Sequence, residues 1–421
     1  EPHHASYFLA PVNDQLLGKP LLYETSSLYG ILSHYFLLAV FGLQLLPLSY
    51  PALMLLLMAV FFGFLVGLYV ILRRWLHSPT YAVVGTLAVY TVLFLFQTSP
   101  TRSVYNFPAL TPFRFWLALP VFALLLHFHR TGRRQAAHAA VAFSRLAIFW
   151  NVETGAALSA ATFVTLLAAG RGRFLARLVR LVGEFLAWVL GVFLLISGVN
   201  WLVYGHPPVW LAYLKELGDF ARGIAMYPLP AVGVFELFVA GALLVVLWQM
   251  FRTRDSTLDM PLLFVALFGA FAMVHYVGES TWQTMFMAAW PFVLLAVFLA
   301  DRVAAKPLLA GRRFVVSILA AGAFFVVGLF FTKLPLEFGN RDYRTMEKSF
   351  WEPPARDEAL LRDAEIIRND FTQERLPLIH FRDAKLLLYS RKTNWFNFYY
   401  SFNLYYKSQV SKLALDFKRE L

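Results

Sequence analysis

The chain has 421 residues, of which 59% are hydrophobic and only 15% charged, with a mean hydropathy of +0.60 and a formal net charge of +12. Soluble globular proteins carry about 45–50% apolar and about 25% charged residues, so this composition excludes that class and predicts a multi-pass membrane protein. The chain has no cysteine, which excludes disulfides, cysteine-ligated metals and thiol nucleophiles.

The first segment, residues 1–50, begins with a polar stretch that precedes a long series of apolar runs. Residues 1–30 contain an acid, two adjacent histidines and further charged groups: Glu1, His3, His4, Asp14, Lys19 and Glu24. Because residue 1 already lies in this polar segment, we expect the numbering to begin after a first span. The apolar run 28–46 carries Tyr29, His34, Tyr35 and Gln44, which favours helices that lie in the membrane interface over a crossing span.

Apolar runs that approach the length of a membrane span, about 20 residues, follow this segment. They lie at roughly 51–72, 81–97, 113–129, 137–150, 155–170, 181–204, 230–251, 261–279, 284–300 and 313–332. Residues 51–332 are therefore expected to form a transmembrane domain of about ten spans.

Lysine and arginine concentrate in every second loop between these runs. The basic loops contain Arg73 and Arg74; Arg130, Arg133 and Arg134; Arg171, Arg173, Arg177 and Arg180; Arg252 and Arg254; and Arg302, Lys306, Arg312 and Arg313. Such loops face the cytoplasm, so the positive charge indicates orientation in the bilayer and not nucleic-acid binding. The first segment then lies on the extracytoplasmic side with the poorly charged loops, if 28–46 does not cross.

Two further regions are expected outside the membrane on that same side. Residues 205–229 place Trp210, Leu211, Leu214 and Leu217 near helical spacing, which predicts a helix on the membrane surface. Residues 333–421 become polar and are expected to form a small, incomplete α/β segment. It would include an amphipathic helix at 355–371 and a strand at 376–381, followed by a helix or strand at 385–389.

The polar groups of the first segment suit sugar transfer. Transfer needs a carboxylate that deprotonates an acceptor hydroxyl, and Glu1 and Asp14 are candidates. It also needs a cation that neutralises the departing phosphate, either a basic side chain or a divalent metal such as Mg²⁺ or Mn²⁺. Lys19 and Arg102 are candidate basic groups, and His3 or His4 is a candidate metal ligand; a solvated interfacial loop remains the alternative.

The order of residues in this segment resembles the first outer loop of the GT-C superfamily of polytopic glycosyltransferases. The resemblance rests on Glu1-Pro-His-His, Tyr7, Asn13-Asp14-x-x-x-Gly18-Lys19, Thr25 and Tyr29-Gly30. A turn of the form Trp-Asn-x-acid-x-Gly at residues 150–155 is also similar to one in GT-C relatives. The family includes protein mannosyltransferases and aminoarabinose transferases.

This resemblance implies an all-α polytopic fold and a specific activity. The enzyme would move a sugar from a polyprenyl-phosphate carrier to a glycan, lipid or protein acceptor, on the extracytoplasmic face of a bacterial inner membrane. It implies Glu1 as the catalytic acid, with Asp14 as second choice. By residue chemistry, Arg102 and Lys19 are the candidates for the donor phosphate, and an interfacial anchor near lipid headgroups is the alternative for Arg102. Substrate contacts are expected from Tyr7, Tyr29, Glu153, His275 and Glu279.

Two other functions remain open from the sequence. A transporter or lipid flippase would show two related halves with broken spans and charges at mid-depth, whereas the charges here gather at the ends of the apolar runs. A non-catalytic membrane subunit with a degenerate GT-C loop is the other alternative, because no second acid occurs in residues 98–112.

Overall fold

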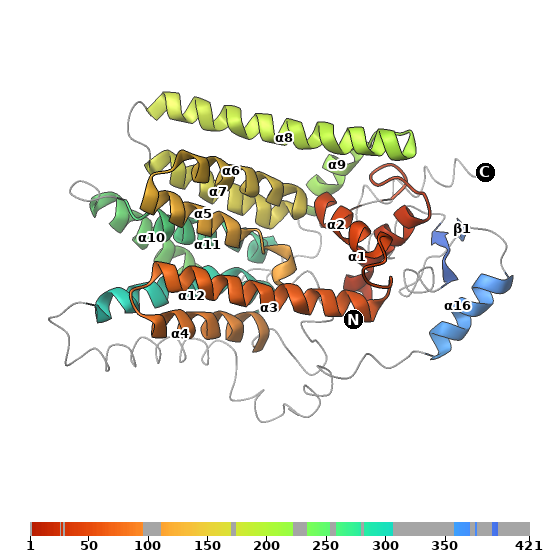
Figure 1. Cartoon of the computed structure of the whole chain (residues 1–421), viewed down its shortest axis with the longest axis horizontal. Helices are drawn as coiled ribbons and strands as arrows, with labels where there is room; N and C mark the ends of the chain where they lie inside the picture. Colours follow the sequence, from red (N-terminus) through yellow and green to blue (C-terminus); the bar gives the residue numbers. More distant parts are fainter. Residues whose placement is uncertain are drawn as a thin grey trace.

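A computed structural model describes residues 2–25, 27, 30–95, 111–169, 174–221, 234–252, 258–278, 282–305, 358–370, 375–376 and 390–394. Within these ranges the chain is almost entirely helical, and most of the long helices run side by side as a bundle (Figure 1). The prediction of a helical fold is confirmed for these residues, and their long apolar helices support a membrane protein.

The helices of the N-terminal half are α1 (Pro2–Leu16), α2 (Ile31–Gly42), α3 (Tyr50–Trp75), α4 (Pro79–Tyr90) with a π-helical extension η1 (Thr91–Leu95), the 3-10 turn η4 (Pro112–Arg114), α5 (Ala118–Thr131), α6 (Arg134–Trp150), α7 (Val152–Ala169) and α8 (Phe174–Tyr204). They are followed by α9 (Trp210–Ala221), α10 (Val234–Arg252), α11 (Met260–Gly278), α12 (Trp282–Ala304) and α16 (Glu358–Asp370), and by the strands β1 (Arg375–Leu376) and β2 (Thr393–Asn394).

The predicted apolar runs between residues 51 and 300 coincide with α3 to α8 and α10 to α12. Among the described residues, five helices are long and apolar enough to cross a membrane: α3, α7, α8, α11 and α12. This is fewer than the ten expected, because α5 and α6 have only 14 and 17 residues and α4 and α10 have shorter apolar stretches. The predicted run 313–332 lies outside the described residues.

Local sequence signals set several helix ends. Ser49 accepts a hydrogen bond from the Ala52 amide at the start of α3, and Ser78 accepts one from the Thr80 amide at the start of α4. In both helices a proline follows this cap, at a position where no amide donor is needed. The helix α5 ends at Gly132, whose φ of 69° is a left-handed conformation that glycine adopts without strain.

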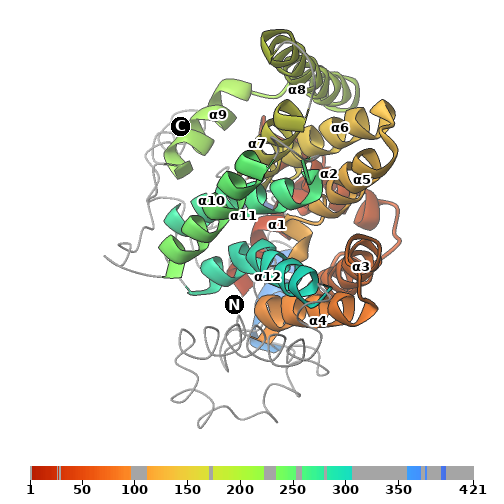
Figure 2. The same cartoon turned by 90° about the vertical axis from the view of Figure 1, so that its left-hand side faces the viewer.

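The helices α5, α6, α7, α11 and α12 pack in the middle of the bundle, and α6 and α7 approach closely. A Cβ added at Gly155 of α7 would lie 2.1 Å from the carbonyl oxygen of Ala147 in α6. Figure 2 shows α8 at one edge of the bundle and α3 with α4 at the opposite edge. Most apolar side chains of α8 are exposed in the isolated chain, as expected for a helix that faces lipid.

The helices of the first segment pack on one end of the bundle, which we call the α1 end. Figure 1 shows α1, α2 and α9 gathered there. Phe8, Leu9 and Val12 of α1 and Leu37 and Phe41 of α2 are buried within the main hydrophobic core. The predicted helices in 1–50 are therefore present, and they contribute to the core as well as covering this end.

The C-terminal region contains the predicted amphipathic helix as α16, and β1 pairs with β2 as a two-stranded parallel sheet. The Asn13 side-chain amide of α1 donates a hydrogen bond to the Lys392 carbonyl at 3.2 Å. That bond links the region before β2 to the α1 end. Residues 385–389 and most of the predicted strand 376–381 lie outside the described residues.

Candidate functional site

A cluster of polar side chains lies at the α1 end, where three segments distant in the sequence meet. Arg114 comes from η4, and His275 comes from the last turn of α11. Asn151, Glu153 and Thr154 come from the turn between α6 and α7 and the start of α7. We call these five residues the Arg114 cluster.

The centre of the cluster is an ion pair between Arg114 Nη2 and Glu153 Oε2. His275 Nδ1 lies 2.7 Å from the same carboxylate oxygen and 3.2 Å from Arg114 Nη2. The side chains of Arg114 and His275 are only 5% and 8% exposed, whereas that of Glu153 is 32% exposed. The carboxylate of Glu153 is therefore the accessible member of this trio.

Asn151 fixes the orientation of the guanidinium. Its Oδ1 accepts hydrogen bonds from Arg114 Nε at 3.2 Å and from the Thr154 amide at 3.1 Å. The Thr154 hydroxyl lies 2.8 Å from Asn151 Oδ1 and 3.0 Å from the Arg114 carbonyl oxygen. Arg114 is thus held at both its side chain and its backbone, and a guanidinium held in this way is positioned before any ligand arrives.

Aromatic side chains connect the first segment to the residues next to the cluster, Phe113 and Trp150. Trp150 Nε1 donates to the Phe113 carbonyl at 2.6 Å, next to Arg114 in the chain. The ring of Phe8 in α1 contacts Phe113 edge-on at 5.7 Å between centroids, and Phe36 of α2 lies 5.4 Å from Trp150. These contacts place α1 and α2 directly beside the segment that carries Arg114.

Gly30 joins the two motifs on which the GT-C resemblance rests. Its φ is 155°, and a Cβ built there would lie 2.0 Å from the carbonyl oxygen of Trp150 and 2.9 Å from that of Phe149. Any residue larger than glycine would collide with this backbone. Gly30 of the first segment therefore packs against Trp150, the first residue of the Trp-Asn-x-acid-x-Gly turn.

A buried histidine holds α2 against α1. His34 Nδ1 is 2.7 Å from Ser27 Oγ, and its Nε2 is 3.1 Å from the Tyr7 carbonyl oxygen. Burial lowers the pKa of His34 to about 4, although its hydrogen bonds to the backbone of Tyr7 and Gly30 raise it in part. The imidazole is therefore neutral at physiological pH.

The structure brings together two of the predicted substrate contacts, Glu153 and His275, and adds Arg114, which the sequence did not single out. Arg114 lies inside the apolar run 113–129, which the sequence predicts to be a span. An ionisable residue within an apolar run is a functional candidate by default, and Arg114 is such a residue.

The other predicted site residues are not part of the Arg114 cluster. Asp14 and Lys19 are both buried and lie 3.6 Å apart as an ion pair, and Tyr7 is buried in α1. Their assignment to catalysis, donor phosphate and substrate stays a prediction. Glu1, Tyr29, Arg102 and Glu279 lie outside the described residues.

His3 and His4 lie in α1, but their side chains are outside the described part of the structure. In the part that is described, no group of three or more His, Asp or Glu side chains could hold a metal ion. The metal assignment of these two histidines therefore also stays a prediction.

Comparison with protein-family models, with curated proteins and with solved structures finds no match to this chain.

Proposed function

We propose that this membrane protein is a GT-C-type glycosyltransferase. It would move a sugar from a polyprenyl-phosphate carrier to an acceptor on the extracytoplasmic side. The proposal is supported mainly by the contact between the first segment and the turn that presents Glu153, made where Gly30 packs against Trp150. The two motifs that resemble GT-C loops are far apart in the sequence, yet they adjoin one another at a single cluster of charged groups.

The roles divide according to what sugar transfer requires. Glu1, or Asp14, would act as the base that takes the proton of the acceptor hydroxyl. Arg102 and Lys19, or a divalent metal, would neutralise the carrier phosphate as the sugar leaves. For Lys19 this would require its buried pair with Asp14 to open, so Arg102 is the simpler choice.

Glu153 would contact the sugar. Its carboxylate is partly exposed, and it is held on its inner side by Arg114 and His275. A carboxylate in this position can accept hydrogen bonds from sugar hydroxyls without moving. Tyr7, Tyr29 and Glu279 would line the same site. Arg114 would then be a positioning residue that acts through Glu153.

The orientation follows from the basic residues at the opposite end. Arg73 and Arg74 lie in the last turn of α3, and Arg130 and Arg134 flank the α5–α6 turn. By the positive-inside rule, that end would face the cytoplasm. The α1 end would then face the compartment in which polyprenyl-phosphate sugars are used by this class.

Carrier release by the purified protein tests the proposal. The protein is incubated with a polyprenyl-phosphate sugar, and the freed carrier is measured for the wild type, Glu1→Gln and Glu153→Gln. We expect Glu1→Gln to lower turnover about 10²-fold or more and Glu153→Gln to lower it about tenfold, mainly through substrate binding.

Glu236→Gln is the matched control, because Glu236 is an exposed carboxylate in the first turn of α10, just as Glu153 lies in the first turn of α7. It should retain turnover. Equal turnover in all four proteins would contradict the site assignment, and carrier binding without any release would favour the non-catalytic subunit.

A further inference from the structure

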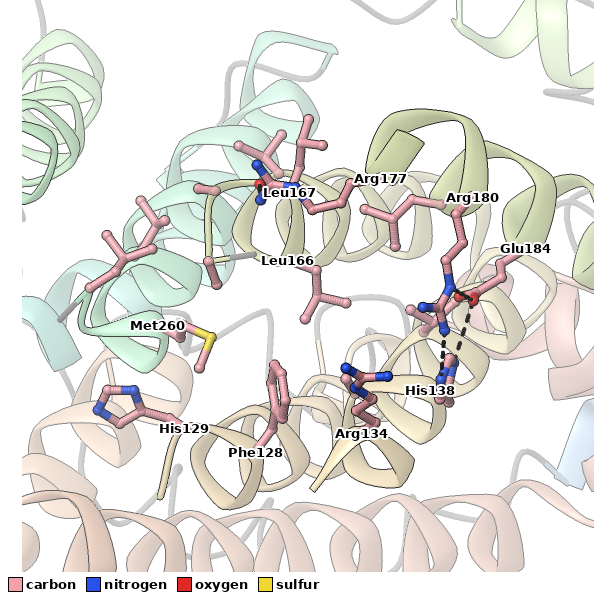
Figure 3. A pocket seen from close by; sticks show the side chains of 18 of the residues that line it. Phe128, His129, Arg134, His138, Leu166, Leu167, Arg177, Arg180, Glu184 and Met260 are labelled. Atoms are coloured by element: carbon pink, nitrogen blue, oxygen red, sulfur yellow. Dashed lines mark hydrogen bonds and ion pairs between the residues drawn. The ribbon is translucent and has the colours of Figure 1, made fainter. Parts of the chain in front are cut away.

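A large cavity opens at the end of the bundle opposite the Arg114 cluster. Its volume is about 1310 Å³, and it is lined by the end of α5, the start of α6, the end of α7, the start of α8 and the start of α11 (Figure 3). The Arg114 cluster lies at the other ends of α6, α7 and α11. The cavity is therefore separate from the proposed transfer site.

The charged side chains of this cavity are predominantly basic. Among its described lining residues are three arginines, Arg134, Arg177 and Arg180, and a single acid, Glu184. His129 and His138 also line it. This balance favours an anion over a neutral or cationic ligand.

The arginines come from two helices that face each other across the space. Arg134 belongs to the first turn of α6, and Arg177 and Arg180 belong to α8 (Figure 3). The Arg177 guanidinium donates to the Leu167 carbonyl at 2.6 Å, so it is anchored to the end of α7. Arg180 lies 2.9 Å from Glu184 Oε1 and 2.9 Å from His138 Nε2.

Glu184 is the group that opposes anion binding. Its carboxylate neutralises part of the charge of Arg180 and lies 3.5 Å from His138 Nδ1. A bound anion would compete with Glu184 for Arg180. Removal of this carboxylate should therefore strengthen binding, an effect that loss of folding could not imitate.

The rest of the cavity wall is apolar and continues onto a lipid-facing helix. Phe128, Leu166 and Met260 line the interior. On the neighbouring turns of α8, Phe174, Leu175 and Val179 are 58%, 69% and 64% exposed. A ligand with a charged head and an acyl chain could place the head among the arginines and the chain along α8.

We propose that this cavity is a binding site for a phosphate-bearing anion, with the chemistry of an anionic phospholipid headgroup. Arginine binds phosphate oxygens through paired hydrogen bonds, and basic pockets between helices on the cytoplasmic side suit anionic headgroups. The site lies in the leaflet opposite the transfer site, so it binds a structural or regulatory lipid and not the sugar donor.

Binding to the purified full chain in detergent tests this site. Short-chain phosphatidylglycerol, phosphatidylcholine and soluble glycerol phosphate are titrated separately, and bound ligand is counted by native mass spectrometry. We expect phosphatidylglycerol to bind more tightly than phosphatidylcholine. Glycerol phosphate that binds as tightly as phosphatidylglycerol would identify a free phosphoryl anion as the ligand, whereas much weaker binding would identify the lipid.

Three variants show whether the arginines of the cavity are responsible. Arg134→Gln should weaken phosphatidylglycerol binding roughly fivefold, the effect of one basic group near a membrane surface. Glu184→Gln should strengthen it by a similar factor. Arg133→Gln is the matched control, because Arg133 is exposed beside Arg134 but does not line the cavity.

Equal weakening by Arg133→Gln and Arg134→Gln would overturn the proposal, because it would show diffuse surface attraction. Unchanged binding in Arg134→Gln and Glu184→Gln together would overturn it as well.

Discussion

An Arg–Glu–His trio occurs at each end of the bundle, and the two trios differ in how they are built. At the α1 end, Arg114, Glu153 and His275 come from three separate segments, and the arginine and histidine are almost fully buried. At the opposite end, Arg180 and Glu184 are one helical turn apart on α8, and His138 contacts both. There the side chains of Arg180 and His138 are 56% and 48% exposed.

The same three side-chain types therefore have different consequences. Water screens the exposed trio, so its ion pair contributes little to stability, although its charges remain available to a ligand. In the other trio, which we call the buried trio, Arg114 and His275 are screened much less, and both depend on the partly exposed Glu153 for a counter-charge or hydrogen bond. The difference suits a fixed substrate site at one end and an adaptable anion site at the other.

The largest expected effect on stability comes from the contact between Gly30 and Trp150, next to the buried trio. Gly30→Ala would place a Cβ within 2.0 Å of the Trp150 carbonyl oxygen at a φ of 155°. Overpacking and backbone strain together should cost at least about 3 kcal/mol of unfolding free energy. Detergent-titrated unfolding and size-exclusion chromatography would measure the loss.

Gly63→Ala is the control for this change, because a Cβ at Gly63 of α3 meets open space. It should be neutral or stabilise the protein by about 0.5–1 kcal/mol. A Gly30→Ala protein as stable as Gly63→Ala would show that α2 does not pack tightly against the α6–α7 turn.

The next largest effect is expected from pH, because His34, which joins α1 and α2 at the end with the buried trio, is neutral when folded. His34 has a pKa of about 4 when folded and an ordinary value of 6.5, so between these values the unfolded chain binds the proton first. The free energy of unfolding is therefore unaffected by protonation of His34 above pH 6.5, and it falls as the pH decreases from 6.5 toward 4. The loss reaches up to about 3 kcal/mol.

Unfolding of the wild type and of His34→Gln, each measured from pH 7.5 to 4, isolates this contribution. The variant is expected to be less stable at pH 7.5 but to lose less stability on acidification. Parallel curves for the two proteins would mean that His34 is protonated as readily in the folded state as in the unfolded one.

A double-mutant cycle on Arg114 and Glu153 addresses the buried trio itself. Arg114→Gln and Glu153→Gln each leave a partner in the cluster without its counter-charge, and the double variant removes both charges. We expect a coupling energy of about 1–3 kcal/mol in unfolding free energy. Strict additivity would contradict a coupled pair.

The smallest effect is expected from the same cycle at the exposed trio. Arg180→Gln, Glu184→Gln and the double variant should give a coupling of about 0.3–0.5 kcal/mol, the usual value for an exposed pair one helical turn apart. Raising the salt concentration should reduce it further. A coupling equal to that of Arg114 and Glu153 would remove the distinction between the two ends.

The sequence predicted the helices well because apolar runs report directly on burial and lipid contact. The runs at 51–72, 155–170 and 181–204 correspond to α3, α7 and α8, and the helix predicted within 205–229 corresponds to α9. Among the described residues, five helices meet the length and hydropathy of a membrane span, and α5 and α6 are shorter, so the expectation of about ten spans stays a prediction.

The sequence predicted some residues of the Arg114 cluster but not their contacts. Glu153 and His275 were singled out separately, but periodicity carries no information on which segments meet, so their 2.7 Å contact could not be foreseen. Arg114 was hidden within an apolar run. Gly30 belongs to the Tyr29-Gly30 pair that resembles a GT-C loop, but the structural requirement for glycine there is contact with the Trp150 backbone, which depends on tertiary packing.

Sidedness tests the central claim most directly, because both proposed sites depend on which end faces the cytoplasm. This chain has no cysteine, so single cysteines can be placed at Leu17, exposed after α1, and at Arg133, exposed before α6. We predict that a membrane-impermeant maleimide labels Leu17→Cys in intact cells and Arg133→Cys only after permeabilisation. The reverse pattern would place the first segment in the cytoplasm and contradict the account.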